Sequence, residues 1–331
     1  MHIPVLQKEV LQYLDPRPNQ NFVDATIGGA GHALAILEKN RPKGKILGID
    51  RDPDILKILK QRLQTQKYRE AYSDRVILVC ENFANLKTVA EKEGFQPIHP
   101  VRGQRRLAGA QRKQISNGVH GILFDLGFSS WHLAESKRGF SFLKDEPLDM
   151  RYAKSSGVRA EEMINQQSQE EIEKILREYG EERFAKHISK EIVEARKKKP
   201  IKTTFQLVEI IKKAVPGWYR HKKIHFATRT FQALRIAVNS ELSSLEKALP
   251  QALDILTPGG RQERTSPEGA GRLAVISFHS LEDRIVKYFF KKETEKGTIK
   301  ILTKKPVRPS NEEIKINPAA RSAKLRAAVK T

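Results

Sequence analysis

Cysteine is almost absent from this sequence. Cys80 is the single cysteine among 331 residues, which excludes an intramolecular disulfide and any metal site built from several cysteines. Long apolar runs are also lacking, since no segment approaches the roughly 18 apolar residues of a membrane-spanning helix. Residues Met1–Leu6 do not have the apolar core of a secretory signal. We therefore expect a cytoplasmic protein that does not enter a membrane.

Acidic residues are scarce relative to basic ones. The chain has 39 aspartates and glutamates against 61 lysines and arginines, which gives a formal charge of +22. A bias of this size is typical of proteins that bind a polyanion, most often nucleic acid, although a basic but generic surface is the alternative. The hydrophobic content of 39% and the charged content of 30% indicate a globular chain, long enough for two domains.

A strand–loop–helix pattern stands near the start of the chain. The apolar run Phe22–Asp24 ends in an acid, the small residues Ala25–Gly31 follow, and Ala33–Lys39 is compatible with a helix. This order predicts the first βα unit of a nucleotide-binding fold. Glycines let a ligand touch the backbone, and the helix N-terminus offers N–H groups that the helix itself does not use. An ordinary βα turn is the alternative interpretation.

A second apolar run, Lys45–Asp50, also ends in an acid. Asp50 lies 19 residues after Gly31, which is the spacing at which a carboxylate binds ribose hydroxyls. A dinucleotide-binding loop reads G-x-G-x-x-G, but Leu34 stands where the third glycine belongs. The loop therefore fits S-adenosylmethionine (SAM) better than NAD, and an NAD-dependent enzyme is the disfavoured alternative.

Three further apolar runs predict strands three to five of a parallel sheet. They are Arg75–Val79, Gly121–Asp125 and Arg272–Ser277. The last run begins 147 residues after Asp125, far more than one crossover connection requires. The predicted fold class is therefore α/β, a Rossmann-like SAM-dependent methyltransferase sheet with an inserted all-helical domain.

The long connection has the features of a helical domain. Ser168 and Glu171 form a capping-box pattern, and apolar residues recur at helical spacing after them. Thr203 opens a later helix that Pro216 closes. These signals predict several short helices rather than strands.

We place the SAM-dependent methyltransferase domain at residues 1–134 and 227–331, and the inserted domain, which we expect to recognise the substrate, at 135–226. Between residues 183 and 223 the chain carries 13 basic residues against 3 acidic ones. This excess predicts contacts with phosphates, although the run Arg196–Lys199 is also typical of a solvated helix end.

Other segments give weaker predictions. We expect a short helix at Val5–Leu14, one long helix over 228–248, and a half-buried last strand in which Ala323–Val329 alternates apolar and basic residues. Residues 97–118 and 261–271 read as insertions. The first contains five basic residues and no acid, and we expect it to be a mobile surface loop that touches RNA.

Nine short motifs, spread along the chain, resemble those of the bacterial 16S rRNA cytosine-N4 methyltransferases. They are His2-x-Pro4-Val5-Leu6, Asp24-Ala25-Thr26 with its glycine loop, Gly48-Ile49-Asp50-Arg51-Asp52, Asp125-Leu126-Gly127-x-Ser129-Ser130, Arg138-Gly139-Phe140-Ser141-Phe142, Leu148-Asp149-Met150-Arg151, Phe231-Gln232-Ala233-Leu234-Arg235-Ile236, Ser277-Phe278-His279-Ser280-Leu281-Glu282-Asp283-Arg284 and Arg321-Ser322-Ala323-Lys324-Leu325-Arg326. The resemblance covers the whole chain apart from the two insertions, and together the motifs are highly specific.

The resemblance implies SAM as the methyl donor and a cytidine in the decoding region of small-subunit ribosomal RNA as the acceptor, which we expect within the assembled small subunit. By position, the family's SAM contacts fall on Ala30, Gly31, His32, Asp50, Phe83 and Asp125. A further contact, usually glutamine, falls on His132, and histidine can also donate a hydrogen bond. Ala30 replaces a common glycine, and we expect it to avoid positive φ.

Cytosine N4 is a weak nucleophile, because the nitrogen lone pair is delocalised into the ring. An acceptor for the amine hydrogens localises that pair and takes the released proton. Many amino-methyltransferases use an Asn/Asp-Pro-Pro-aromatic loop after strand four, which this chain lacks. Asp125 occupies that place and is our candidate acceptor, with a purely cofactor-binding role as the alternative. Asn239 and His279 are the other catalytic candidates, and His279 is equally suited to cap the following helix.

Other chemistries fit less well. Methylation at cytosine C5 would need a cysteine nucleophile, and we expect Cys80 to lie in the core. The nine histidines are scattered singly and predict no metal site. A rival from another class is a non-catalytic ribosome-assembly factor that keeps a SAM pocket. The intact glycine loop and Asp50 favour the enzyme.

Overall fold

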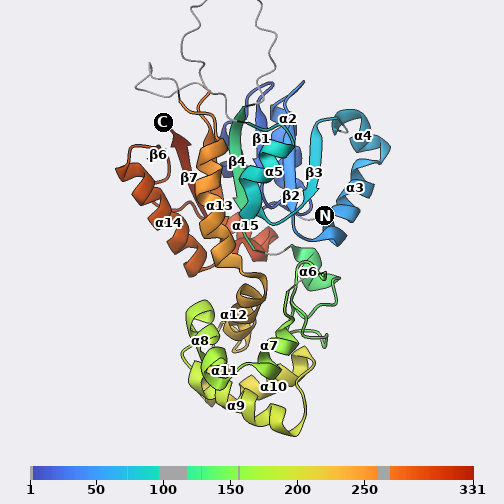
Figure 1. The fold of residues 1–331 in the computed structure, drawn as a ribbon, viewed down its shortest axis with the longest axis vertical. Coiled ribbons are helices and arrows are strands. Elements are labelled where there is room, and N and C mark those ends of the chain that lie inside the picture. Colours follow the sequence, from blue (N-terminus) through green and yellow to red (C-terminus); the bar gives the residue numbers. More distant parts are fainter. Residues whose placement is uncertain (1–2, 73, 97–117, 128, 156, 260–268) are drawn as a thin grey trace, which may run out of the picture. The chain divides into compact units, whose positions relative to one another are not determined.

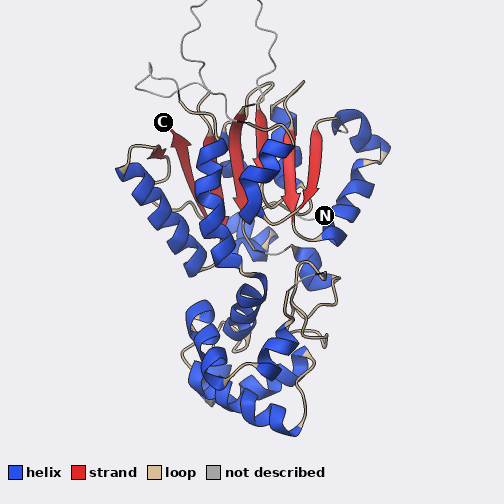
Figure 2. Cartoon of the chain, in the orientation of Figure 1, coloured by secondary structure: helices blue, strands red, loops and turns tan. Residues whose placement is uncertain are grey.

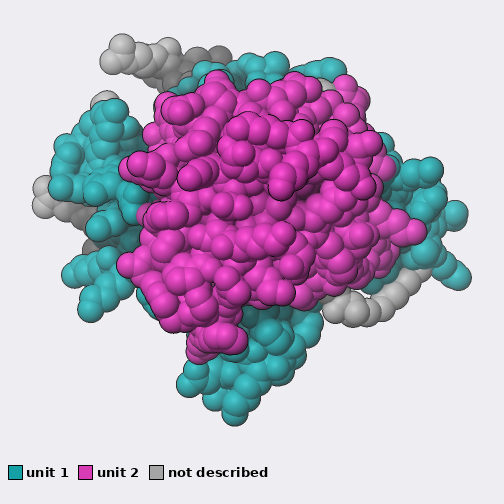
Figure 3. Space-filling model, turned by 90° about the horizontal axis from the view of Figure 1, so that it is seen from below, with its two compact units in different colours: residues 1–127, 243–331 teal, residues 128–242 magenta. Residues whose placement is uncertain are grey.

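A computed structural model describes residues 3–72, 74–96, 118–127, 129–155, 157–259 and 269–331 of the chain. The chain divides into two compact units (Figure 3): unit 1 comprises residues 1–127 and 243–331, and unit 2 comprises residues 128–242. The domain boundaries expected from the sequence, after residues 134 and 226, stay predictions. The insertions expected at 97–118 and 261–271 lie almost entirely outside the described residues.

The described residues of unit 1 form a seven-stranded sheet in the order β3-β2-β1-β4-β5-β7-β6 (Figure 1). Strands β1 to β5 run parallel, β7 is antiparallel to β5, and β6 is antiparallel to β7. The strands are β1 (Asn21–Asp24), β2 (Ile46–Asp50), β3 (Val76–Cys80), β4 (Val119–Asp125), β5 (Arg272–Ser277), β6 (Ile299–Ile301) and β7 (Lys324–Lys330). The five parallel strands expected from the sequence are therefore confirmed, as is the last strand.

The strand order reverses at β1. Strands β2 and β3 lie on one side of it, and β4 and β5 lie on the other. Open α/β sheets bind their ligands beyond the carboxyl ends of the strands at such a switch point. The topology therefore marks the ends of β1 and β4 as the place to look for a site.

Helices cover both faces of the sheet (Figure 2). Side chains alternate along β4, so Leu123 packs in one core with α1, α2 and α3, whereas Ile122 and Phe124 pack in the opposite core with α5, α13 and α14. The helices of unit 1 are α1 (Gln7–Leu14), α2 (Gly31–Lys39), α3 (Pro53–Leu63), α4 (Gln66–Tyr72), α5 (Leu86–Lys92), α13 (Glu241–Ile255, which starts in unit 2), α14 (Ser280–Glu295) and α15 (Asn311–Ile316), with the 3₁₀ helices η1 (Phe83–Asn85) and η2 (Pro318–Ser322). Among the described residues, no helix is both long and apolar enough to span a membrane.

Most helices of unit 2 surround a third apolar core. They are α7 (Ala160–Gln166), α8 (Gln169–Gly180), α9 (Ala185–Lys198), α10 (Thr204–Ala214), α11 (Gly217–Arg220) and α12 (Thr228–Asn239), and the short helix α6 (Ser130–Ala134) precedes them in the chain. The expected capping box of α8 is confirmed, because Glu171 N–H donates to Ser168 Oγ at 3.1 Å and Ser168 N–H donates to Glu171 Oε2 at 2.7 Å. Thr203 caps α10 in the same way. These elements agree with the predicted α/β fold class with inserted helices.

The expectation of one long helix over 228–248 is wrong. Helix α12 ends at Asn239, Ser240 adopts a left-handed conformation with φ of 51°, and α13 begins at Glu241. The Asn239 side chain donates to the carbonyl of Arg235 at 3.0 Å, and Arg235 forms an ion pair with Glu241 across the break at 2.8 Å. These contacts stabilise the break between α12 and α13. They cannot be predicted from the spacing of apolar residues in the sequence.

Two burial predictions are also wrong. Strand β7 is buried along its five central residues rather than on one face, because Leu325 packs in one core, Ala328 packs in the opposite core, and Arg326 is satisfied by Asp283 at 2.6 Å. Cys80 is exposed rather than in the core, because it ends β3, a strand at the edge of the sheet.

Candidate active site

Three aspartates lie at the carboxyl edge of the sheet in unit 1. Asp24 ends β1, Asp50 ends β2 and Asp125 ends β4. The strands are parallel neighbours, with Asp24 opposite Gly48 of β2 and Leu123 of β4. Because parallel strands end at the same edge, three carboxyl groups gather at the switch point of the sheet.

The loop between β1 and α2 has a backbone that a ligand can approach. A Cβ built on Gly29 meets nothing within 4 Å among the described residues, so space is open beside it. A Cβ on Gly31 would lie 2.4 Å from Cγ of Pro4, so this position requires glycine for packing. The expectation that Ala30 avoids positive φ is wrong: its φ is 62°, and it occupies the left-handed position directly before α2.

Asp50 is tied to the backbone of the neighbouring loops. Its Oδ2 accepts a hydrogen bond from Gly28 N–H at 3.1 Å, and its Oδ1 accepts one from Asp52 N–H at 2.9 Å. Each carboxylate oxygen can accept more than one hydrogen bond, so the group keeps capacity for hydroxyl donors. The contacts fix the carboxylate against the glycine loop.

Asp24 is the most enclosed of the three acids. Asp24 is 2% exposed, and burial raises the pKa of its carboxyl group to about 7. The imidazole of His32 and the N–H of Thr26, which donates to Oδ1 at 3.2 Å, act in the opposite direction, while the carboxylates of Asp125 and Asp50 raise the pKa further. The three acids therefore form one electrostatic group around Asp24.

His32 joins this group from the first turn of α2. Its Nε2 lies 3.5 Å from Oδ2 of Asp125, and the residue is 5% exposed. Neither ring nitrogen of His32 has a hydrogen-bond partner among the described residues, and the same holds for Oδ1 of Asp125. Buried polar atoms in proteins are normally satisfied, so this cluster is a candidate binding site.

Phe83 follows β3 and opens η1. Its ring meets Phe124 of β4 edge to face, with centroids 5.7 Å apart, and it packs partly buried against the core. The side chain thus has a structural role, and one part of it remains accessible beside the carboxyl edge of the sheet.

His132 belongs to unit 2, where it is enclosed by aromatic rings. Its Nδ1 accepts a hydrogen bond from Ser129 N–H at 3.1 Å, which completes the cap of α6. The rings of Phe140 and Tyr152 lie 4.9 and 5.0 Å from it. Because Nδ1 accepts, the neutral ring carries its proton on Nε2, which is a hydrogen-bond donor.

Asn239, also in unit 2, has a fully used amide. Its Nδ2 donates to the carbonyls of Met150 and Arg235 at 2.7 and 3.0 Å, and its Oδ1 accepts from Tyr152 N–H at 3.0 Å. The residue is 2% exposed. These bonds tie α12 to the segment before α7 within unit 2.

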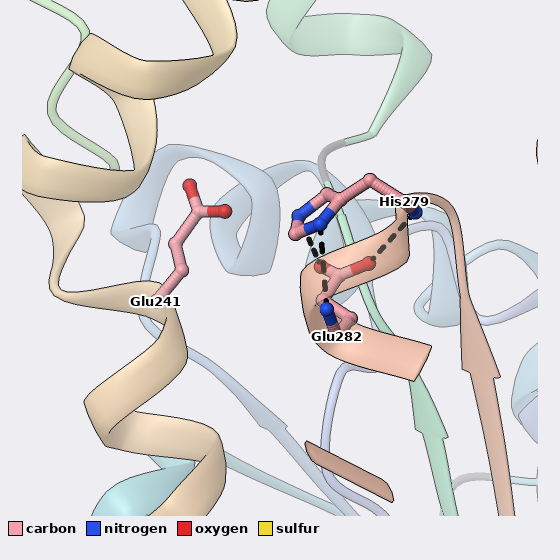
Figure 4. A group of neighbouring side chains, drawn as sticks. All are labelled: Glu241, His279 and Glu282. Carbon is pink, nitrogen blue, oxygen red and sulfur yellow. Dashed lines mark hydrogen bonds and ion pairs between the residues drawn. The ribbon is translucent and has the colours of Figure 1, made fainter. Parts of the chain in front are cut away.

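His279 caps α14 of unit 1 (Figure 4). Its Nδ1 accepts from Glu282 N–H at 3.4 Å, Glu282 Oε2 accepts from His279 N–H at 3.3 Å, and the imidazole Nε2 lies 3.2 Å from Glu282 Oε1. The capping role that the sequence left open for His279 is therefore present in the structure.

Comparison with known proteins decides the family. The model of the MraW methylase family matches residues 1–331. The chain belongs to the MraW methylase family. It is 43% identical over 344 residues to a curated protein of Heliobacterium mobile, which covers 99% of this chain and 98% of the relative. A protein of Geobacter sulfurreducens gives the same identity and coverage, and one of Dehalococcoides mccartyi is 41% identical, covering 99% of this chain and 86% of its own length. Each relative is named ribosomal RNA small subunit methyltransferase H.

In this member of the MraW family, unit 1 brings His32, Asp50 and Asp125 to one edge of the sheet, together with the glycine loop. His132 and Asn239 are positioned within unit 2. The sequence did not identify Asp24 as a titrating group. A titrating Asp24 could have been expected from its position at the end of an apolar run, because the strand formed by that run is buried at all four residues.

Proposed function

We propose that this chain transfers a methyl group from SAM to the exocyclic N4 amine of a cytidine in the decoding region of 16S ribosomal RNA. Membership of the MraW methylase family and the names of its relatives support a ribosomal RNA methyltransferase. The net charge of +22 suits a polyanionic substrate. The observation that carries the proposal is the gathering of acids and unsatisfied polar atoms beside an open glycine loop at the switch point of the sheet.

The residues at this edge fit SAM, whose sulfonium and amino groups are cationic. Asp50 and Asp125 supply negative charge, the open space at Gly29 admits a ligand to the backbone, and the ring nitrogens of His32 lack hydrogen-bond partners among the described residues. The proposed cofactor contacts are Ala30, Gly31, His32, Asp50, Phe83, Asp125 and His132. Asp50 would accept from the ribose hydroxyls, and Phe83 would lie against the adenine.

The position of Asp125 suggests its role in methyl transfer. SAM supplies an electrophilic methyl group on its sulfonium. Asp125 would accept a hydrogen bond from the N4 amine of the cytidine, which localises the nitrogen lone pair, and would then hold the proton that the amine loses. The side chain of Asp125 is 21% exposed, so part of its carboxyl group can be reached by a substrate, while Oδ1 is enclosed and has no partner among the described residues.

Among the three catalytic candidates, Asp125 is the best supported. The amide of Asn239 makes three hydrogen bonds within unit 2, which give it a local structural role. His279 caps α14 through Nδ1, while its Nε2, 3.2 Å from Glu282 Oε1, makes no hydrogen bond among the described residues. A cofactor-binding role alone is the remaining alternative for Asp125.

We extend the proposal to organisation and partner. The methyltransferase domain would comprise residues 1–134 and 227–331, and the helices of 135–226 would recognise RNA within the assembled small subunit, in the cytoplasm. The test is incubation of the chain with SAM and small subunits that lack the modification, followed by mass mapping of the RNA. One added methyl group on a single decoding-region cytidine is expected. Binding of SAM and of the particle without methyl transfer would instead support a non-catalytic assembly factor.

A further inference from the structure

Trp218 is exposed on the surface of unit 2. It lies in the short helix α11 (Figure 1), and 54% of it is accessible. The ring of Phe184, at the start of α9, lies 5.9 Å from it, and the ring of Tyr219 lies 5.8 Å from it. A tryptophan this exposed leaves a large apolar surface in water, which in proteins commonly marks a binding site.

The aromatic group beneath Trp218 is held in place. Tyr219 is 7% exposed, and its hydroxyl donates to Oε2 of Glu182 at 2.9 Å. The other oxygen of Glu182 accepts from Phe184 N–H at 2.9 Å, and Glu182 is itself 2% exposed. The one acid in this group is therefore buried and hydrogen-bonded within unit 2.

Two exposed cations flank the tryptophan ring. The guanidinium carbon of Arg183 lies 5.5 Å from the centre of the Trp218 ring and 5.8 Å from that of Phe184. Nζ of Lys222 lies 4.8 Å from the centre of the Trp218 ring. Among the described residues, neither cation forms an ion pair with an acid. We call Trp218, Phe184, Arg183 and Lys222 the Trp218 platform.

The other prominent basic run of unit 2 has a local explanation. Arg196, Lys197 and Lys198 form the last turn of α9, where positive side chains stabilise the helix end. Arg196 donates to the carbonyl of Ile164 at 2.6 Å, and Lys197 pairs with Glu194 at 2.7 Å. The cations of the Trp218 platform, by contrast, have no acid partner among the described residues and lie over aromatic rings.

We propose that the Trp218 platform binds single-stranded RNA, with an unpaired base stacked on Trp218 and the flanking phosphates contacted by Arg183 and Lys222. Aromatic rings stack on bases of any sequence, and neighbouring cations bind the backbone, which is the usual construction of single-strand sites. Residues 183–223 contain 13 basic and 3 acidic residues. This positive charge is complementary to the negative backbone of RNA. The choice of RNA as occupant rests on the proposed function.

The first test measures binding of a labelled single-stranded oligoribonucleotide to the full chain, without SAM, by fluorescence anisotropy. Trp218→Ala should weaken binding about 5- to 150-fold, the range that loss of one base–aromatic stack produces. Trp218→Phe keeps a ring and should lose less. The matched control is Tyr288→Ala, since Tyr288 is 60% exposed and Lys287 lies 5.9 Å from its ring in unit 1. This control should bind like wild type.

The second test separates stacking from charge. With Arg183 and Lys222 both changed to alanine, the fall of log affinity with log salt should become shallower by roughly 1.4, about 0.7 for each phosphate that is no longer neutralised. Trp218→Ala should keep the wild-type slope. Thermal unfolding of each variant shows whether the fold is intact, which is expected because all three side chains are exposed.

Three results would overturn the inference: no oligonucleotide binding by wild type, wild-type affinity in Trp218→Ala, or equal losses in Trp218→Ala and Tyr288→Ala. If Trp218→Ala binds the oligonucleotide normally but binds the small subunit less well, the platform contacts protein and the RNA proposal fails.

Methyl transfer by the wild-type chain is measured separately. Wild-type transfer with unchanged RNA binding in Trp218→Ala refutes the platform alone. A loss of RNA binding in that variant, with no transfer by wild type, refutes the proposed function alone.

Discussion

Nε2 of His32 lies 3.5 Å from Oδ2 of Asp125, although 93 residues separate them in the chain. The contact connects the first turn of α2 to the end of β4, across the switch point of the sheet. Asp24 interacts electrostatically with both residues. Residues of the glycine loop and the proposed proton acceptor therefore interact electrostatically. A change of charge at one of them should change the electrostatic potential at the others.

Asp50→Ala should weaken SAM binding ~10-fold or more, because a carboxylate that accepts from ribose hydroxyls makes charge-assisted hydrogen bonds. Calorimetric titration with SAM measures the affinity, and thermal unfolding checks that the loop contacts to Gly28 and Asp52 are not essential to the fold. Asp54→Ala, in the first turn of α3, is the matched control and should bind SAM normally. An unchanged affinity in Asp50→Ala would remove Asp50 from the site.

Gly31 and Gly29 should respond differently to alanine. A Cβ at Gly31 would collide with Pro4 at 2.4 Å, so Gly31→Ala should reduce the free energy of unfolding by about 1–3 kcal/mol. A Cβ at Gly29 meets nothing within 4 Å in the part of the chain that the structure describes, so Gly29→Ala should keep the wild-type stability within about 0.5 kcal/mol. If the cofactor touches this backbone, Gly29→Ala should nevertheless bind SAM less well. Equal denaturation midpoints for the two variants would contradict the packing argument.

Asp24 should make stability fall as pH rises through the range from about 4 to about 7. Burial raises the pKa of its carboxyl group from 3.8 to about 7, so between these values the folded chain binds a proton that the unfolded chain has lost. Asp24→Asn keeps an acceptor for Thr26 N–H but does not ionise. Relative to this variant, wild type should lose stability on the order of a few kcal/mol between pH 4 and pH 8. Denaturant unfolding of both proteins across this range measures the difference, and parallel curves would sink the prediction.

The sequence predicted the parallel strands and the helix caps because their causes are local. Apolar runs that end in acids specify buried strands, and Ser168 with Glu171 specifies a helix start wherever the helix packs. The break at Ser240 depends instead on Arg235 and Glu241 meeting across it, which no local pattern encodes. The exposure of Cys80 follows from the position of β3 at the sheet edge.

Local reasoning also failed inside the site. A left-handed backbone at Ala30 costs about 1–2 kcal/mol for a residue with a Cβ, so propensity argues against it, and the fold imposes it all the same. The raised pKa of Asp24 needs the burial and charges around it, which only the folded chain provides. No local pattern marks Trp218, because the two cations at its ring, Arg183 and Lys222, come from separate segments of the chain.

Asp125→Asn should separate catalysis from cofactor binding. The substitution keeps the size of the side chain and one acceptor oxygen but removes the charge. If Asp125 accepts the N4 proton, the rate at saturating SAM and RNA should fall ~10²–10⁴-fold, the usual effect of losing a positioned acid–base group. SAM affinity should change much less than the rate does.

His32→Gln is the companion variant, since His32 contacts Asp125 at 3.5 Å from the loop side. If Asp125 is the acceptor and His32 only positions it, this change should lower the rate by a smaller factor than Asp125→Asn does. The measurement is single-turnover methyl transfer to small subunits from pH 6 to 9, with SAM affinity determined in parallel. A weaker SAM affinity with an intact saturated rate in Asp125→Asn would make Asp125 a cofactor ligand. The acceptor would then be sought at His279, at Asn239 or at a backbone carbonyl.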